Sequence, residues 1–197
     1  MNTARHYDLL IDENNDPFRD PAQLQEYMEQ WDGKAFLDAL KLTGKENVLE
    51  IGIGTGRIAA KAAPQCMHLT GIDFSVKTIE RAKENLKEFP NISLICDDFE
   101  THHFQETFDV VYSSLTMMHF ENKEDIIAKA GALLNPGGIF CLSLDKNRSE
   151  YIDMGTRKIR IYPDDPENIK KLIMASTMKI TNVIETEMAY ILAGVKK

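Results

Sequence analysis

The sequence has few cysteines, one tryptophan and no long apolar run. Its 197 residues include three cysteines, Cys66, Cys96 and Cys141, and no two of them are close together. This spacing argues against a disulfide framework and against a zinc site, so we expect no bound metal. No segment approaches the ~20 apolar residues of a membrane span, and the first residues lack the apolar core of a signal peptide. We therefore expect a cytoplasmic protein that does not contact membranes.

Basic side chains are also in deficit. The chain has 23 Lys and Arg against 31 Asp and Glu, which gives a formal net charge of −8. Such a balance disfavours a surface for nucleic acid, because phosphate backbones are bound by clustered Lys and Arg. A small or cationic ligand suits this charge better, and we expect no nucleic-acid partner.

Size and hydropathy indicate one soluble domain covering residues 1–197. Hydrophobic residues make up 43% of the chain, enough for a substantial core. Residues 1–46 form an expected N-terminal helical cap. Its first part, as far as Pro21, is polar, and residues 22–42 have apolar positions at helical spacing, with Gly33 dividing them into two helices.

From Asn47 onward, short apolar runs alternate with helical patterns. The runs 48–51, 67–72, 92–96, 108–113 and 139–144 predict strands, and 57–63, 75–88 and 122–134 predict helices, with Ser75 as an N-cap. This alternation is typical of a mostly parallel sheet covered on both faces, a Rossmann-like α/β/α sandwich. After a helix at 167–175, strands at 179–185 and 189–195 are joined too tightly for a crossover, so we expect an antiparallel final pair.

The most informative segment follows the first of these strands. Gly52, Gly54 and Gly56 occupy alternate positions between the strand and a helix. Glycines allow the backbone to turn sharply and to approach a ligand closely, and the free N–H groups of a helix start face that ligand. Asp73 ends the second strand, where a carboxylate can accept from both ribose hydroxyls. A nucleotide-like ligand is therefore expected at the carboxyl ends of the strands.

The glycine spacing leaves two cofactor classes open. The dinucleotide fingerprint Gly-x-Gly-x-x-Gly requires a third glycine where this chain has Arg57, if the pattern starts at Gly52. If it starts at Gly54, the third position is Ala59, which that fingerprint tolerates. An NAD(P)-dependent oxidoreductase thus remains an alternative, whereas a P-loop is excluded because no Gly-Lys-Ser/Thr follows.

Several motifs together resemble those of the class I S-adenosylmethionine-dependent methyltransferases. Glu50 with the three glycines matches the family's first motif, and Asp73 falls at its ribose-binding acid. The resemblance covers residues 47–145 well and the remainder loosely. It is extended by three further segments in the family's order: Cys96-Asp97-Asp98-Phe99, Phe108 to Ser114, and Leu133 to Gly138. The family normally has glycine where this chain has Cys96.

The resemblance implies S-adenosylmethionine as the cofactor and a seven-stranded sheet ordered 3-2-1-4-5-7-6 with an antiparallel seventh strand. It implies that Asp97 contacts the adenine amino group, with the Asp98 backbone beside it, and that Phe74 and Ser113 also belong to the cofactor site. Glu50 would organise the glycine loop or bind the ammonium end of the ligand. An unpaired carboxylate at the end of a buried strand would otherwise be costly.

Four further residues are candidates for the acceptor side of the site. His119 follows the fourth strand and is a candidate general base, with a structural role in the loop as the alternative. Tyr7 and Trp31 precede the sheet and could hold a cationic or planar substrate against their rings. Arg157, after the fifth strand, could meet an anionic group, although a mixed-charge loop is commonly a solvated surface.

The predicted function is methyl transfer from S-adenosylmethionine to a small-molecule acceptor. Besides the oxidoreductase, a non-catalytic protein that binds S-adenosylmethionine remains possible on these patterns. The Asn/Asp-Pro-Pro-Tyr/Phe sequence that marks amino-group methylation in related enzymes does not occur. This absence and the negative charge both favour a small acceptor over nucleic acid.

Overall fold

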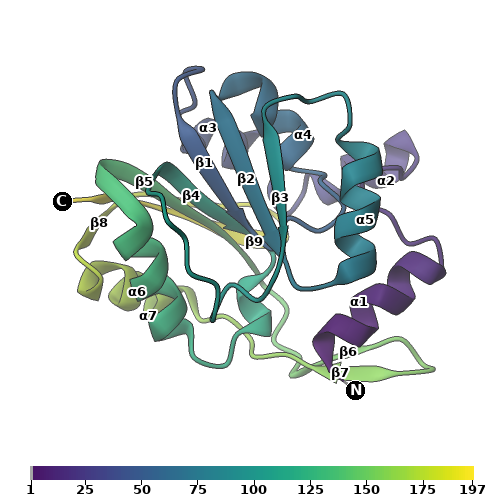
Figure 1. The fold of residues 1–197 in the computed structure, drawn as a ribbon. Helices are drawn as coiled ribbons and strands as arrows, with labels where there is room; N and C mark the ends of the chain where they lie inside the picture. Colours follow the sequence, from purple (N-terminus) through teal and green to yellow (C-terminus); the bar gives the residue numbers. More distant parts are fainter. Residues whose placement is uncertain (1) are drawn as a thin grey trace.

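A single twisted sheet forms the centre of the molecule, in a computed structural model that describes residues 2–197. Its strand order is β3-β2-β1-β4-β5-β9-β8 (Figure 1). All neighbouring strands from β3 to β5 are parallel, whereas β9 is antiparallel to both β5 and β8. The expected fold class and strand order are thereby confirmed. The strands are β1 Asn47–Ile51, β2 His68–Asp73, β3 Ile92–Cys96, β4 Phe108–Ser114, β5 Leu134–Asp145, β8 Met178–Glu185 and β9 Ala189–Lys196.

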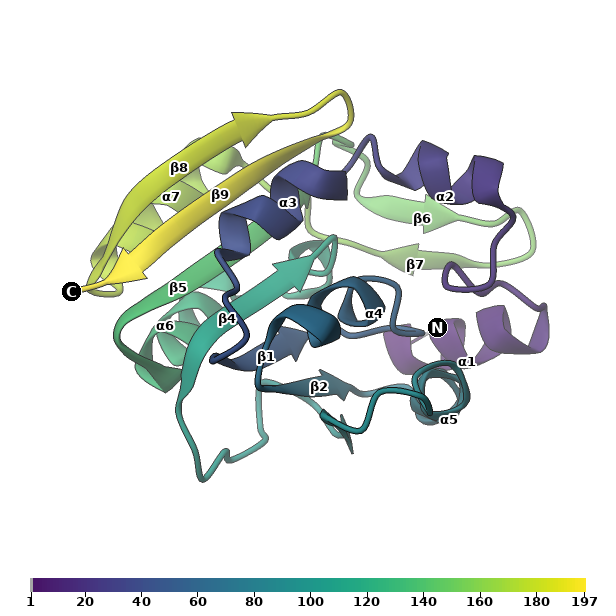
Figure 2. The same ribbon diagram turned by 90° about the horizontal axis from the view of Figure 1, so that it is seen from above.

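Each face of the sheet packs against helices because strand side chains alternate between the two faces. On one face, Leu49 and Ile51 join a core with α6 (Lys123–Leu133) and α7 (Pro166–Ala175). On the other face, Val48 joins a core with α3 (Gly33–Leu40), α4 (Ala59–Ala62) and α5 (Val76–Asn85). Figure 2 shows these two layers with the sheet between them. The consecutive residues of β1 thus supply both cores.

Local capping explains where several helices begin. The Ser75 side chain accepts from the backbone N–H of Thr78 at the start of α5, as the sequence predicted. Asp165 caps α7 by accepting from the N–H groups of Glu167 and Asn168, and Pro166 occupies the first turn. The Asn122 side chain does the same for Asp125 in α6. Each cap satisfies N–H groups that have no partner within the helix.

One helix and one β-hairpin were not expected from the sequence. The polar start of the chain contains α1 (Thr3–Asp12), which lies against α5. Between β5 and α7 the chain forms a hairpin of β6 (Tyr151–Asp153) and β7 (Lys158–Arg160), at the lower edge of the molecule in Figure 1. The helix α2 (Ala22–Met28) has no buried residue. None of the helices in residues 2–197 combines the length and the apolar character needed to span a bilayer.

Two of the predicted boundaries need correction. The helix after the glycines is shorter than residues 57–63, since α4 is followed by the 3-10 turn η1 (Ala63–Gln65) around Pro64. The fifth strand starts earlier, at Leu134, because Leu134 pairs with Phe108 before the ladder resumes at Ile139. Cys66 and Cys141 are buried, whereas Cys96 is exposed at the end of an edge strand.

Candidate active site

A cavity of about 280 Å³ opens at the carboxyl ends of β1, β2 and β4. In parallel sheets this edge is where ligands bind, near the point at which strand order reverses. Here the reversal lies between β1 and β4, and both strands contribute to the wall. The N-terminal segment closes one side through Tyr7, Pro17 and Met28, so the cap and the sheet build the cavity together.

The glycine loop has the geometry that the sequence predicted. Gly52, Gly54 and Gly56 all have positive φ, at +73°, +56° and +96°. A Cβ at Gly52 would lie 2.4 Å from the Thr116 side chain, and one at Gly56 would lie 2.7 Å from Leu86. A Cβ at Gly54 would meet no atom within 4 Å. Packing therefore requires two of the glycines, whereas Gly54, which lines the cavity, keeps a path open for a ligand.

Asp73 lies beside the glycine loop, although 19 residues separate it from Gly54. Its Oδ2 accepts from the Gly54 backbone N–H at 3.1 Å, and its Oδ1 accepts from Ser75 N–H at 2.9 Å. Burial raises the pKa of Asp73, and these backbone hydrogen bonds oppose that rise. The carboxylate is thus held at the cavity wall with Phe74, which also lines the cavity.

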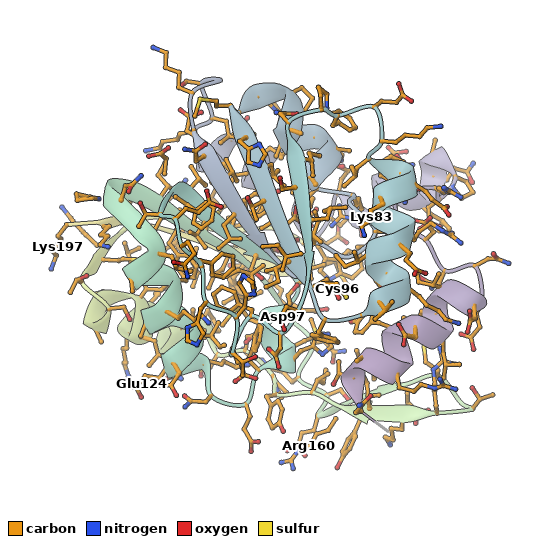
Figure 3. The ribbon with its side chains drawn as sticks, viewed as in Figure 1. Lys83, Cys96, Asp97, Glu124, Arg160 and Lys197 are labelled. Atoms are coloured by element: carbon orange, nitrogen blue, oxygen red, sulfur yellow. The ribbon has the colours of Figure 1, made fainter. Side chains whose placement is uncertain are left out.

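Asp97 lines the cavity beyond Asp73, at the end of β3 (Figure 3). Its Oδ2 lies 2.8 Å from Nδ1 of His102, and its Oδ1 accepts from Asp98 N–H. These hydrogen bonds lower the pKa of Asp97 and keep it ionised. Asp98 does not line the cavity. His102 thus holds the Asp97 carboxylate in place.

Glu50 and Tyr112 face each other across β1 and β4, which their register places side by side. The Tyr112 hydroxyl donates to Glu50 Oε2 at 2.7 Å. Glu50 is only 2% exposed, and burial raises its pKa to about 8 even though this hydrogen bond opposes the rise. Ser113, predicted for the same site, instead donates to the backbone oxygen of Ile51 and does not line the cavity.

A buried ion pair that the sequence did not reveal lies beneath the cavity. Asp32, the N-cap of α3, accepts from the Arg57 guanidinium, from Ser114 Oγ at 2.6 Å and from Gly33 N–H. Burial alone would raise the pKa of Asp32, but Arg57 and the other donors outweigh it and the net pKa is lowered. Arg57 and Ser114 line the cavity. Only folding joins these positions, so no local pattern marks them.

Tyr7 and His119 meet at the cavity wall across 112 residues of sequence. The Tyr7 hydroxyl oxygen lies 2.8 Å from Nε2 of His119, and the two rings meet edge to face. Burial, with the charges of His6 and Lys123, lowers the pKa of His119 to about 4, so the imidazole is neutral at physiological pH. Burial also raises the pKa of the Tyr7 phenol. Two predicted residues thus form one pair.

The other two acceptor-side candidates lie outside the cavity lining. Trp31 packs edge to face against Tyr27, with ring centroids 5.2 Å apart. Arg157 forms a two-pronged ion pair with Glu13 and donates from Nε to His6 Nδ1 at 3.1 Å. It therefore joins the hairpin to α1. Among the described residues, no group of three or more His, Cys, Asp or Glu side chains could hold a metal ion.

Comparison with known proteins agrees with this geometry. Residues 48–138 match the family model of a methyltransferase domain. An uncharacterised methyltransferase of Mycobacterium bovis is 30% identical over 104 residues, covering 53% of each chain. A ubiquinone biosynthesis O-methyltransferase of Vibrio parahaemolyticus is 28% identical over 165 residues, covering 80% of this chain and 66% of its own. The chain spans about half the length of the mycobacterial relative.

Solved structures share the fold. An N-methyltransferase of Bradyrhizobium japonicum, in complex with S-adenosyl-L-homocysteine, aligns with a TM-score of 0.67 at 20% identity. The alignment covers 83% of this chain and 87% of that one. Residues 48–138 are therefore a methyltransferase domain by the family match, and the solved structure shows that its fold is shared.

Proposed function

We propose that this protein binds S-adenosylmethionine in the cavity and transfers its methyl group to a small-molecule acceptor. One observation carries the proposal: the open glycine loop, Asp73 and Asp97 line a single cavity at the strand ends. The residues fit the cofactor by their chemistry. A Cβ at Gly54 would meet no atom within 4 Å, and Asp73 and Asp97 supply two carboxylates that can accept from a ribose and from an adenine amino group.

Each residue has a separate task in this proposal. Asp73 accepts from the ribose hydroxyls, Asp97 accepts from the adenine amino group, and Phe74 packs beside them. The Asp32–Arg57 pair and Glu50 form the polar floor below the glycine loop, where the amino-acid end of the cofactor would lie. The cofactor supplies an activated methyl group on a sulfonium, which leaves by in-line displacement. The protein's main contribution is then to place the acceptor close and collinear.

The names of two relatives favour a small acceptor. The Vibrio relative is named for ubiquinone biosynthesis, and an Ilyobacter polytropus relative is named as acting on a malonyl group on acyl-carrier protein. The net charge of −8 disfavours a nucleic-acid acceptor.

Calorimetry with S-adenosylhomocysteine tests the cofactor directly. We expect a dissociation constant in the micromolar range or tighter, about −8 kcal/mol. In Gly54→Val, saturable binding should be lost because the branched side chain enters the ligand's space. Gly44→Val is the matched control, since Gly44 also has positive φ and open space, at +93°, but lies before β1 and away from the cavity. It should share the backbone strain and keep the affinity.

Two outcomes would contradict the proposal. Absence of S-adenosylhomocysteine binding by a folded protein would reject the cofactor. Tight, saturable NADH binding by the unmodified protein, with S-adenosylhomocysteine affinity unchanged in Gly54→Val, would favour the oxidoreductase. We expect no NADH binding because Arg57, at the third position of the main dinucleotide register, is locked to Asp32.

A further inference from the structure

The charged side chains that line the cavity already have partners in this protein. Arg57 is the one Lys or Arg in the lining, and it is paired with Asp32. Glu50 accepts from Tyr112, and Asp97 is held by His102. No basic side chain in the described lining is therefore available for an anionic acceptor group such as a carboxylate or a phosphate.

The Tyr7–His119 pair is a polar group of the wall that can still change its hydrogen bonding. Nδ1 of His119 is buried and has no partner among the described residues, so no second hydrogen bond fixes the tautomer of the ring. The Tyr7 oxygen can thus donate to Nε2 and accept from a third group, or accept from Nε2–H and donate elsewhere. An oxygen with this freedom can pass a proton from a bound hydroxyl to the imidazole.

The surroundings of the pair are aromatic and apolar. Tyr7 meets Phe74 edge to face at 6.4 Å between ring centroids, and Leu115 and Phe120 line the same cavity. The His6 ring also meets the Tyr7 ring edge to face. This environment suits a planar, uncharged acceptor.

We propose that the acceptor is a small phenol and that Tyr7, backed by His119, is the catalytic residue that removes its proton. The inference rests on the proposed function, because it requires a methyl donor in the adjoining part of the cavity. As the acceptor oxygen forms the new O–CH₃ bond, its proton moves to the Tyr7 oxygen and the Tyr7 proton moves to Nε2 of His119. The C–S bond breaks with its electron pair left on sulfur, so the sulfonium charge is replaced by the imidazolium charge of His119. That proton is later released to water.

The weak basicity of His119 agrees with a phenol and not an aliphatic alcohol. Its pKa of about 4 makes the imidazole a poor acceptor for the proton of an alcohol. A phenol is far more acidic, with a pKa of ~10 as in tyrosine. Removing the proton of a phenol in the transition state therefore requires a weaker base than removing that of an alcohol.

The test compares two phenols that differ in acidity, catechol and 4-nitrocatechol, in Tyr7→Phe and His119→Gln. With catechol, kcat should fall at least ~100-fold in Tyr7→Phe, the lower end of the usual range for loss of general-base catalysis. With 4-nitrocatechol, which ionises more readily in solution, the loss should shrink to below ~5-fold because less proton removal is needed. His119→Gln should show the same pattern. Tyr151→Phe, on the exposed β6 strand, is the matched control and should leave both rates unchanged.

A binding measurement gives a readout that needs no turnover. The absorption band of 4-nitrocatechol depends on its ionisation, so its titration with the protein–S-adenosylhomocysteine complex follows both binding and proton loss. We expect saturable binding, weakened at least ~3-fold in Tyr7→Phe, with the affinity for S-adenosylhomocysteine unchanged within ~3-fold.

The outcomes separate the two proposals. If S-adenosylhomocysteine does not bind, the proposed function fails. If it binds and neither phenol is bound or methylated, or if benzoate or benzylamine is methylated in preference to catechol, the phenol assignment is overturned. Equal rate losses for catechol and 4-nitrocatechol in Tyr7→Phe would overturn the proton-transfer role and leave Tyr7 a structural residue.

Discussion

The Glu50 carboxyl shows how one residue can combine an expected position with an unexpected ionisation state. Its place at the end of β1 follows from the sequence motif. Its pKa of about 8 follows from burial between β1, β4 and α3, where Tyr112 supplies a hydrogen bond and Phe36 packs on the Tyr112 ring. The carboxyl is therefore largely protonated at neutral pH in the ligand-free protein.

This shift makes stability depend on pH. Between the ordinary pKa of 4.5 and about 8, the folded chain retains a proton that the unfolded chain has released. The free energy of unfolding contributed by Glu50 therefore falls as pH rises through this window. Glu50→Gln cannot ionise, so at pH 8.5 it should be more stable than the parent by roughly 1–3 kcal/mol.

Urea denaturation of the ligand-free proteins at pH 5 and pH 8.5 checks this expectation. The two proteins should differ least at pH 5. The exposed Glu80→Gln provides the control and should not alter the pH dependence. Parallel pH profiles for Glu50→Gln and the parent would show that Glu50 ionises normally.

At the scale of elements, polar contacts on two further sides hold α1 to the body of the protein, besides the Tyr7–His119 hydrogen bond. Asp8 accepts from Ser75 Oγ and from Lys77 N–H at the start of α5. On the other side, Arg157 after the β6 strand binds Glu13 and His6. Since α1 carries Tyr7, these contacts position one wall of the cavity.

Replacing Arg157 by methionine keeps an unbranched side chain and removes the charge. We expect faster amide hydrogen exchange in α1, by about 3–10-fold, because local opening of α1 becomes easier. The global free energy of unfolding should change little, since Glu13 is half exposed and the pair is partly solvated.

Exchange measured by mass spectrometry on α1 peptides tests this, with Lys34→Met as the control. Lys34 pairs with Asp38 on the surface of α3 and has no contact with α1. Unchanged exchange in α1 for Arg157→Met would mean that the other contacts of α1 are sufficient to hold the helix.

At the scale of the whole molecule, the cavity joins the N-terminal cap to the sheet, so a ligand bound there should stabilise the fold as a unit. A ligand that binds only the native state adds about 2.7 kcal/mol at 100 times its dissociation constant. For a chain of this length we expect S-adenosylhomocysteine to raise Tm by roughly 5–10 °C at that concentration. NADH at the same concentration should leave Tm unchanged.

Differential scanning calorimetry measures both shifts, and Gly54→Val should lose the response to S-adenosylhomocysteine. A rise in Tm of the same size in Gly54→Val would mean that the ligand binds elsewhere.

The sequence by itself determined the strand–helix alternation, the glycine loop and the positions of Glu50, Asp73 and Asp97. These features are local: a buried strand, a left-handed glycine and an N-cap each depend on residues within a few positions. The resemblance to a known family then supplied the strand order, which alternation alone leaves open. α1 and the β6–β7 hairpin escaped prediction because their short, polar segments carry weak periodicity and gain order from contacts with distant residues.

Only the tertiary structure decided which side chains meet in the cavity. Three pairs show this: Arg57 and Asp32, Tyr7 and His119, and Glu50 and Tyr112 are separated by 25, 112 and 62 residues. The first two pairs form because folding brings the cap against the strand ends, and the third forms because β1 and β4 pair side by side. It also directed Trp31, Arg157, Asp98 and Ser113 away from the cavity lining, towards packing, an ion pair and backbone contacts. Hydrogen bonding and burial act over a few ångströms in space, and sequence separation does not reveal which polar groups will come within that range.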